Sequence, residues 1–322
     1  MKTTTKKVLS LLLAAATVVA CTLSLSSCGK KKGYTVGICQ LVRHEALDAA
    51  TQGFKDALTE ALGAENVTFI EQNAQNDTNA CSTIVTDFVS KKVDLIMANA
   101  TPALQAAFNA TTTIPVLGTS ITEYGVALDI QDFNGTVGGN VSGTSDLAPL
   151  TEQADMILEL FPDAKNVGLI YCSAEPNSEY QVKVIEEYLA DKGLTCTRFS
   201  FSDSNDISAV TTAAAAQSDV IYIPTDNTAA SCSETIGNIV REKKVPVVAG
   251  EEGICAGCGV ATLSISYYDL GVKTGEMAAK ILKGEEKISE MPIEYATATK
   301  MYNPAICEEL GITVPEGYTA IE

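Results

Sequence analysis

The side chains that most often carry out enzyme chemistry are scarce in this sequence of 322 residues. It has one histidine, His44, which excludes a zinc, copper or haem site built from several histidines. No Gly-x-Ser-x-Gly segment is present to hold a nucleophilic serine. The glycine-rich segment 135–140 lacks the Gly-x-Gly-x-x-Gly order of a dinucleotide-binding loop. The sequence therefore predicts no catalytic residues, no metal and no cofactor, and a protein that is not an enzyme.

Polar side chains gather instead just after the apolar segments that have strand character. Because the carboxyl ends of parallel strands meet at one edge of a sheet, these side chains are expected to lie together at a ligand-binding site. The set is rich in hydroxyl and amide groups and poor in charge, which suits a small zwitterion better than a phosphate, a metal ion or a large apolar molecule. Its members are Gln40, His44, Thr101, Ser120, Asn177, Ser178, Asp226 and Asn227.

Asp226 is the most informative member of this set, and two roles are open to it. A carboxylate at a junction between a strand and a helix is commonly the N-cap of that helix. Thr225 and Asn227 could cap the helix instead, which would leave Asp226 to bind the ammonium group of a ligand with about 1.5–3 kcal/mol. His44 has a similar choice between a hydrogen-bonding role at a helix start and a role in ligand binding.

Alternating short strands and helices are needed to position these residues, and the residue pattern predicts them. The expected strands are apolar throughout, which is typical of parallel sheets covered by helices on both faces. In the first half of the chain they are residues 34–39, 67–71, 93–98 and 114–118. Helices are expected at 45–62, 79–90, 102–109, 270–282 and 303–310, with an extended segment at 292–299.

The second half of the chain repeats the first. Residues 36–38 (Val-Gly-Ile) match 167–169 (Val-Gly-Leu), and 114–116 (Ile-Pro-Val) match 245–247 (Val-Pro-Val) at the same spacing. The sequence therefore predicts an α/β protein of two similar doubly wound parallel-sheet lobes joined by a hinge, with a cleft between them that closes by hinge motion.

The lobe boundaries follow from the repeat and from composition. A stretch at 125–149 is rich in Gly, Asn, Ser and Asp and is expected to connect the lobes. Lobe 1 is expected at 34–145 with roughly 266–298 crossing back, and lobe 2 at 146–265 with roughly 299–322.

Residues 1–27 have the pattern of a secretory signal peptide. Three lysines precede an apolar run at 8–20, which is shorter than a membrane-spanning helix of about 20 residues. The run leads to 25–29 (Leu-Ser-Ser-Cys-Gly), which resembles the lipobox of bacterial lipoproteins. A competing cut before Cys21 would shorten the apolar run. Cys28 is therefore the expected lipidation site, with 28–33 as a tether, and the protein is expected outside the cytoplasm, anchored to the bacterial cell membrane.

The remaining cysteines and the net charge limit which ligands and partners the protein can have. Cys39, Cys172 and Cys196 fall in or beside strand patterns, where buried thiols act as small apolar groups. Cys255 and Cys258 form the only close pair; a redox or metal site, a disulfide or free loop thiols are possible, and the flanking glycines favour free loop thiols. A formal charge of −18 argues against a nucleic-acid partner, because phosphate binding needs a basic surface.

Several segments together carry a resemblance to a known family. They are 37–40 (Gly-Ile-Cys-Gln), 44–48 (His-Glu-Ala-Leu-Asp), 100–103 (Ala-Thr-Pro-Ala), 139–146 (Gly-Asn-Val-Ser-Gly-Thr-Ser-Asp), 175–178 (Glu-Pro-Asn-Ser), 224–227 (Pro-Thr-Asp-Asn) and 311–315 (Gly-Ile-Thr-Val-Pro). Over essentially the whole chain after residue 27 they resemble the ABC transporter substrate-binding lipoproteins of the tryptophan/tyrosine type.

This resemblance implies a periplasmic-binding type I fold and an aromatic amino acid as ligand. It also implies ABC permease and ATPase subunits as partners. By resemblance, the pocket is lined by Thr101, Ser120, Thr144, Asn177, Asp226 and Asn227, with Gln40 and His44 at its edge. The chain departs from the family at Arg43, where many relatives carry a glutamate, so the charge at the rim of the pocket differs.

The resulting hypothesis is a monomeric receptor that closes its lobes over tryptophan, tyrosine or phenylalanine and delivers it to a permease. The ligand side chain is expected between the lobes, against Tyr171 or Tyr222. A sugar or nucleoside receptor of the same fold is the alternative, although sugar clefts commonly use tryptophan and this chain has none. A sensor partner for a membrane receptor would share the same fold.

Overall fold

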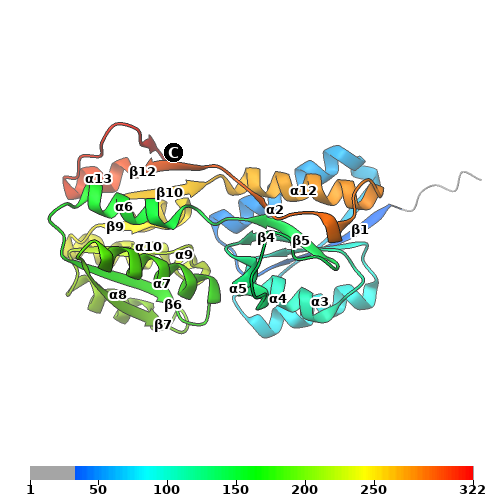
Figure 1. Cartoon of the computed structure of the whole chain (residues 1–322), viewed down its shortest axis with the longest axis horizontal. Coiled ribbons are helices and arrows are strands. Elements are labelled where there is room, and N and C mark those ends of the chain that lie inside the picture. The colour runs from blue at the N-terminus through cyan, green and yellow to red at the C-terminus, as the bar shows by residue number, and fades with distance from the viewer. Residues whose placement is uncertain (1–32, 322) are drawn as a thin grey trace, which may run out of the picture.

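The computed structural model describes residues 33–321, which form two α/β lobes (Figure 1). The predicted signal peptide, Cys28 and the lysines beside it lie outside the described residues. In each lobe a mainly parallel sheet carries one apolar core on each of its faces. Among residues 33–321, no helix combines the length and the apolar character that a bilayer crossing requires.

The sheet of lobe 1 has six parallel strands in the order β11-β5-β4-β3-β1-β2. They are β1 (Tyr34–Gln40), β2 (Val67–Asn73), β3 (Leu95–Asn99), β4 (Val116–Ile121), β5 (Val141–Ser145) and β11 (Glu294–Tyr295). Val36 and Ile38 of β1 pack into one core while Cys39 packs into the other, so this strand is buried on both sides. The helices of this lobe are α2 (Glu45–Leu62), α3 (Thr78–Lys91), α4 (Thr101–Ala110), α5 (Tyr124–Leu128) and α12 (Tyr267–Lys283), with short 3-10 turns at Ala64–Asn66 and Ile288–Glu290.

The sheet of lobe 2 has seven strands in the order β13-β12-β10-β9-β8-β6-β7. They are β6 (Asn166–Cys172), β7 (Thr195–Phe201), β8 (Val220–Ile223), β9 (Val247–Ala249), β10 (Ala261–Ile265), β12 (Ala298–Tyr302) and β13 (Thr319–Ala320). Only the pairing of β12 with β10 is antiparallel within this described sheet. The helices are α6 (Leu150–Leu160), α7 (Pro176–Asp191), α8 (Ile207–Ala215), α9 (Asn227–Ser231), α10 (Ser233–Lys243), α11 (Glu252–Cys258) and α13 (Pro304–Leu310).

The two lobes share one strand order. The first five strands of lobe 1 lie in the order 2-1-3-4-5, and β6 to β10 of lobe 2 repeat it. The predicted fold class, two similar doubly wound lobes, is therefore confirmed. In both lobes the helices that follow β1, β3, β6 and β8 begin at the carboxyl ends of their strands, which is the edge where open parallel sheets bind ligands.

Three segments cross between the lobes: 146–149, 266 and 296–297. The sequence predicted 125–149 as connection, but this stretch contains α5 and also β5, a fifth strand of lobe 1. The strand escaped prediction because its residues, Val-Ser-Gly-Thr-Ser, include one large apolar side chain. Its hydroxyls are buried because they bond inside the lobe, as Ser142 Oγ does to the Met291 carbonyl at 3.0 Å.

Helix α12 belongs to lobe 1 although it follows lobe 2 in the chain, and it packs along α2 (Figure 1). Glycines allow the two backbones to approach closely. A Cβ atom added at Gly53 would lie 2.1 Å from the Tyr268 carbonyl oxygen, and one at Gly271 would lie 2.0 Å from the Ala50 carbonyl oxygen. This packing fixes the direction of α2, whose first turn carries residues of the predicted site.

Two sequence-based expectations about cysteines and tyrosines are corrected by the structure. Cys255 and Cys258 are free thiols, but they lie buried in helix α11 and not in a loop. Tyr222 does not face the other lobe, because it is fully buried and its hydroxyl donates to Gln153 Oε1 at 2.6 Å. Tyr171 is also in the core of lobe 2. An all-apolar strand pattern does not reveal which of its side chains face the core.

Candidate functional site

The two lobes touch through polar side chains at the carboxyl ends of their strands. His44, directly before α2, places its Nε2 3.3 Å from Asn227 Oδ1 at the start of α9. Asn76, in the loop between β2 and α3, donates from Nδ2 to Thr228 Oγ1 at 2.9 Å. The lobes are therefore in contact at the edges where both sheets present their helix N-termini.

Buried polar atoms without a hydrogen-bond partner mark this region. Among the described residues, three of the predicted site residues carry such an atom: His44 Nδ1, Ser120 Oγ and Asn177 Oδ1. Leaving a buried polar group unpaired costs about 1–3 kcal/mol, so native proteins do so rarely without a functional reason. Asn99 Oδ1, at the end of β3, is also buried without a hydrogen-bond partner. Polar atoms that the fold does not satisfy are available to a polar ligand.

Asp226 is the N-cap of α9, so the first of the two roles considered for it is observed. Its Oδ1 accepts from the Ala229 amide at 2.8 Å and its Oδ2 accepts from the Cys172 amide at 2.6 Å. The side chain is 1% exposed, and burial, together with the negative charge of Glu175, raises its pKa to about 8. Each oxygen retains a second lone pair, so capping does not exclude contact with a ligand.

Glu175, which sequence reasoning did not select as a site residue, lies beside Asp226. It is 4% exposed and accepts five hydrogen bonds, from the backbone and side chains of Asn227 and Thr228 and from Asn177 Nδ2, at 2.7–3.2 Å. No ion pair among the described residues includes Glu175 or Asp226. Two buried carboxyl groups without a cation therefore lie side by side on the lobe 2 side of the interface, and a bound cation would favour the ionised form of Asp226. The sequence signal that could have identified Glu175 is a carboxylate directly before a proline, shortly after the end of a strand.

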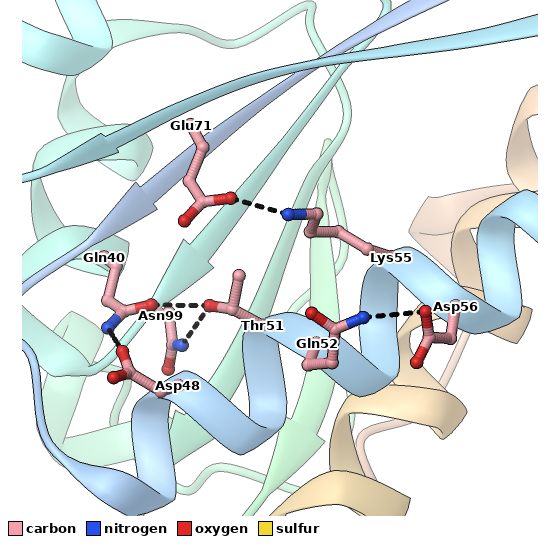
Figure 2. Close-up of polar contacts among 8 residues, drawn as sticks. All are labelled: Gln40, Asp48, Thr51, Gln52, Lys55, Asp56, Glu71 and Asn99. Carbon is pink, nitrogen blue, oxygen red and sulfur yellow. Dashed lines mark hydrogen bonds and ion pairs between the residues drawn. The ribbon is translucent and has the colours of Figure 1, made fainter.

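Gln40 is the centre of a hydrogen-bond network within lobe 1 (Figure 2). Its Nε2 donates to Asp48 Oδ1 at 2.6 Å and to the Val42 carbonyl at 2.8 Å, and its Oε1 accepts from Thr51 Oγ1 at 2.6 Å. Thr51 in turn accepts from Asn99 Nδ2 at 3.0 Å. This network connects the first two turns of α2 to the ends of β1 and β3. It therefore fixes the position of His44, which directly precedes α2.

The other predicted site residues are buried at the same strand ends. Ser120, the last residue but one of β4, has a left-handed φ of 55°, and Thr101 opens α4, whose N-cap Ala100 has no side-chain hydrogen bond to the helix. Ser178, in the first turn of α7, accepts from Asn177 Nδ2 at 3.3 Å. Thr144 is different, because its hydroxyl lies within lobe 1 at 2.9 Å from Thr274 Oγ1.

A hollow of about 300 Å³ opens at the rim of the interface. Residues 43–45 line it from lobe 1, and residues 230–235 with Gly253 line it from lobe 2. Arg43, the residue at which the sequence departs from the resembling family, is exposed here. Residues 33–321 contain no group of three or more His, Cys, Asp or Glu side chains that could hold a metal ion.

Comparison with known proteins agrees with this geometry. A sequence profile of the family described as "ABC transporter substrate binding protein" matches residues 35–320. A tyrosine-binding protein of Clostridioides difficile is 35% identical over 276 residues, which cover 84% of this chain and 79% of that protein.

Two solved structures add information about the lobes. An ABC domain from Streptococcus pneumonia in complex with L-Trp is 32% identical, covers 90% of this chain and all of that one, and has a TM-score of 0.85. A substrate-binding protein with adhesive properties from Clostridium difficile, solved in a ligand-free, open form, is 38% identical over 90% of this chain and 99% of that one, with a TM-score of 0.68. The more similar sequence gives the poorer superposition.

The expectation that the protein is not an enzyme is confirmed by its relatives, which bind solutes. The family model covers nearly all of the described residues, and the curated relative exceeds 30% identity over most of both chains. The chain therefore belongs to the ABC transporter substrate-binding protein family, whose members work outside the cytoplasm.

Proposed function

We propose that this protein is a lipid-anchored receptor that captures an aromatic amino acid between its lobes and delivers it to the permease and ATPase of an ABC importer. The relatives named for tyrosine and solved with L-Trp support this ligand class. The observation that carries the proposal is the pair of buried carboxylates, Glu175 and Asp226, without a cation among the described residues.

The polarity across the interface matches a zwitterion. On the lobe 2 side, Asp226 and Asn177 Oδ1 offer acceptors to the ligand ammonium group. On the lobe 1 side, Ser120 Oγ and the N-terminus of α4 at Thr101 offer donors to the ligand carboxylate. Closure then buries the ligand side chain, and the closed form is the one that docks on the permease.

Ligand binding is tested on the chain beginning after Cys28, by calorimetry and thermal shift with L-tryptophan, L-tyrosine and L-phenylalanine. At 100 times its dissociation constant, a bound amino acid adds about 2.7 kcal/mol of stability. Because the protein has no tryptophan, fluorescence of bound L-tryptophan can be followed without background from the protein. Glucose, galactose and nucleosides form the second arm, and a response confined to them would show that the receptor has a different ligand.

Asp226→Asn tests the ammonium contact. The amide keeps an acceptor for the α9 cap but removes the charge, so affinity for the amino acid should fall about 10- to 100-fold. The melting temperature is expected to fall as well, because the amide nitrogen would face the Cys172 N–H. Unchanged affinity at a temperature where both proteins are folded would remove Asp226 from the binding site.

Anchoring is tested separately in the full-length chain. Replacement of Cys28 by Ala should release the protein from the membrane fraction and abolish incorporation of labelled fatty acid. Replacement of Cys21 by Ala is the control, since the competing cleavage site is expected to be unused.

A further inference from the structure

Glu175 contacts two residues of lobe 2, Asn227 and Thr228, whose side chains in turn contact lobe 1. Its Oε2 accepts from the Asn227 amide N–H at 3.0 Å and from Asn227 Nδ2 at 2.7 Å, and its Oε1 accepts from the Thr228 N–H at 2.9 Å and from Thr228 Oγ1 at 2.8 Å. We call the two contacts between lobes, His44 with Asn227 and Asn76 with Thr228, the closure latch.

The carboxylate determines the direction of the first latch bond. Because Asn227 Nδ2 donates to Glu175, its Oδ1 is turned to the other side, where it faces His44 Nε2. Oδ1 is only an acceptor, so Nε2 of His44 must carry the proton. In the neutral imidazole Nδ1 is then a bare acceptor, and this atom is buried without a partner among the described residues. A donor on the ligand is the group that can satisfy it.

The second latch bond is directed in the same way. Thr228 has a single hydroxyl proton and gives it to Glu175 Oε1. Its Oγ1 can therefore only accept in the other contact, and Asn76 Nδ2 donates to it. Asn76 is held toward lobe 2 by a left-handed φ of 65°, a conformation that asparagine tolerates better than most residues.

We propose that Glu175 is the positioning residue for lobe closure: its carboxylate orients Asn227 and Thr228 as acceptors for His44 and Asn76, and leaves His44 Nδ1 facing the ligand as an acceptor. The proposal rests on the proposed function only in placing the ligand inside the closed cleft. Glu175 itself acts through its neighbours and need not touch the ligand.

The variant Glu175→Gln changes the polarity of this arrangement without changing its size. A glutamine can keep its oxygen toward one latch residue, but its NH₂ group then faces donors on the other, so at least one latch bond loses its direction. Affinity for L-tryptophan or L-tyrosine should fall about tenfold or more, since the closed state becomes less populated. The radius of gyration in solution scattering should increase at a fixed amino-acid concentration.

The single histidine supplies a readout that a general loss of stability would not produce. In the closed protein, burial lowers the pKa of His44, while the contact with Asn227 and the charges of Glu175 and Asp48 raise it by smaller amounts. Arg43, Glu45 and Glu234 line the hollow beside it. If Glu175→Gln acts only by removing a charge, the pKa of His44 must fall further. If the latch opens, water reaches the imidazole and its pKa must rise toward the ordinary value of about 6.5.

Nitrogen-15 NMR titration of His44 distinguishes these outcomes without resonance assignment, because the chain has one imidazole. We expect the pKa to rise in Glu175→Gln; a fall or no change overturns the proposal. Glu251→Gln is the matched control, because Glu251 is also a buried helix cap in lobe 2, 2% exposed, and makes no hydrogen bond to lobe 1 among the described residues. It should leave the titration of His44 unchanged.

A double-mutant cycle with Asn76→Ala supplies a second test on a half-buried residue whose loss does not endanger folding. Asn76→Ala should weaken amino-acid binding in the parent protein and have little further effect in Glu175→Gln. Fully additive effects would contradict the positioning role. The His44 titration is run with and without amino acid, so a parent protein that binds none of the three would refute the proposed function while the ligand-free titration still tests Glu175.

Discussion

Tyr267 donates a hydrogen bond from its hydroxyl to Asp146 Oδ2 at 3.0 Å, and this contact joins the crossing segment 146–149 to the residue directly after the crossing residue 266. Asp146 directly follows β5, and Tyr267 opens α12. Both side chains are buried, and Asp146 Oδ1 has no partner among the described residues. The hinge therefore contains an acidic group that the fold solvates incompletely.

The hinge carboxyl should make stability depend on pH. Burial raises the pKa of Asp146 to about 6, against the ordinary value near 4. Between these values the folded protein binds more protons than the unfolded chain, so this contribution to stability declines as pH rises through that window. Asp146→Asn has no such proton, and its melting temperature relative to the parent should therefore increase between about pH 4 and pH 7. A difference that stays constant over this range would show that Asp146 titrates normally.

Ser120→Ala should separate binding from stability. The Ser120 hydroxyl is buried and unpaired within the described chain, so its removal should leave the melting temperature of the ligand-free protein unchanged or slightly higher. Both residues have a Cβ, so the left-handed conformation strains them alike. Affinity for L-tryptophan or L-tyrosine should fall about fivefold to tenfold, because a hydrogen bond to the ligand is lost.

Thr211→Val provides the opposite pattern for comparison. This buried hydroxyl donates to the Ile207 carbonyl at 2.6 Å inside α8, away from the interface. Its loss should reduce stability and leave affinity unaltered. If Ser120→Ala behaves in the same way, the unpaired hydroxyl has no part in binding.

Gly271→Ala should destabilise lobe 1 strongly. The added methyl group would lie 2.0 Å from the Ala50 carbonyl oxygen, so α12 must move away from α2. Overpacking of this kind costs about 1–3 kcal/mol, and urea denaturation measures it. Gly284→Asn is the control, because Gly284 has a left-handed φ of 73° with open space around it, and should cost less than about 1 kcal/mol. Equal losses in the two variants would show that the helices adjust freely.

The two cysteines of α11 should resist thiol reagents in the native protein. Both are buried, and burial is the main reason that the pKa of each thiol is raised well above its usual value. Since the thiolate is the reactive form, maleimide labelling at pH 8 should reach the half-buried Cys232 first, and Cys196, whose pKa burial raises to about 11, more slowly. Mass spectrometry of digests should find Cys255 and Cys258 labelled only after unfolding. Rapid labelling of this pair in the folded state would indicate an exposed or disulfide-forming site.

Local patterns predicted the elements of this fold well where the pattern is apolar. The stripe of Ala46, Ala50, Phe54 and Leu58 predicts the helix 45–62, and α2 has the same bounds. Strand β5 was missed because its hydroxyls are satisfied by partners far along the chain, as Thr144 is by Thr274. Whether a residue lies on a strand could be inferred; which neighbour its side chain bonds could not.

For the site, too, the positions of residues after strands could be predicted, but the contacts between the lobes could not. His44, Ser120 and Asn177 were selected from their places after strands, and the structure finds an unpaired buried atom on each. Asn76, Thr228 and Glu175 were not selected, because their importance depends on how the lobes meet. The arrangement of the two lobes depends on the crossing segments, and no periodic pattern in the sequence indicates it. Their roles in binding stay predictions that the variants above can test.

The place of α12 in the chain has a consequence for assembly. Lobe 1 needs this helix to cover Phe54 and Leu58, together with β11 to complete its sheet edge, yet both elements follow lobe 2 in the order of synthesis. A chain interrupted at residue 265 would present the apolar face of α2 to water. Neither half can therefore finish folding alone as the chain emerges, and such a chain can be kept unfolded until all of it has been made.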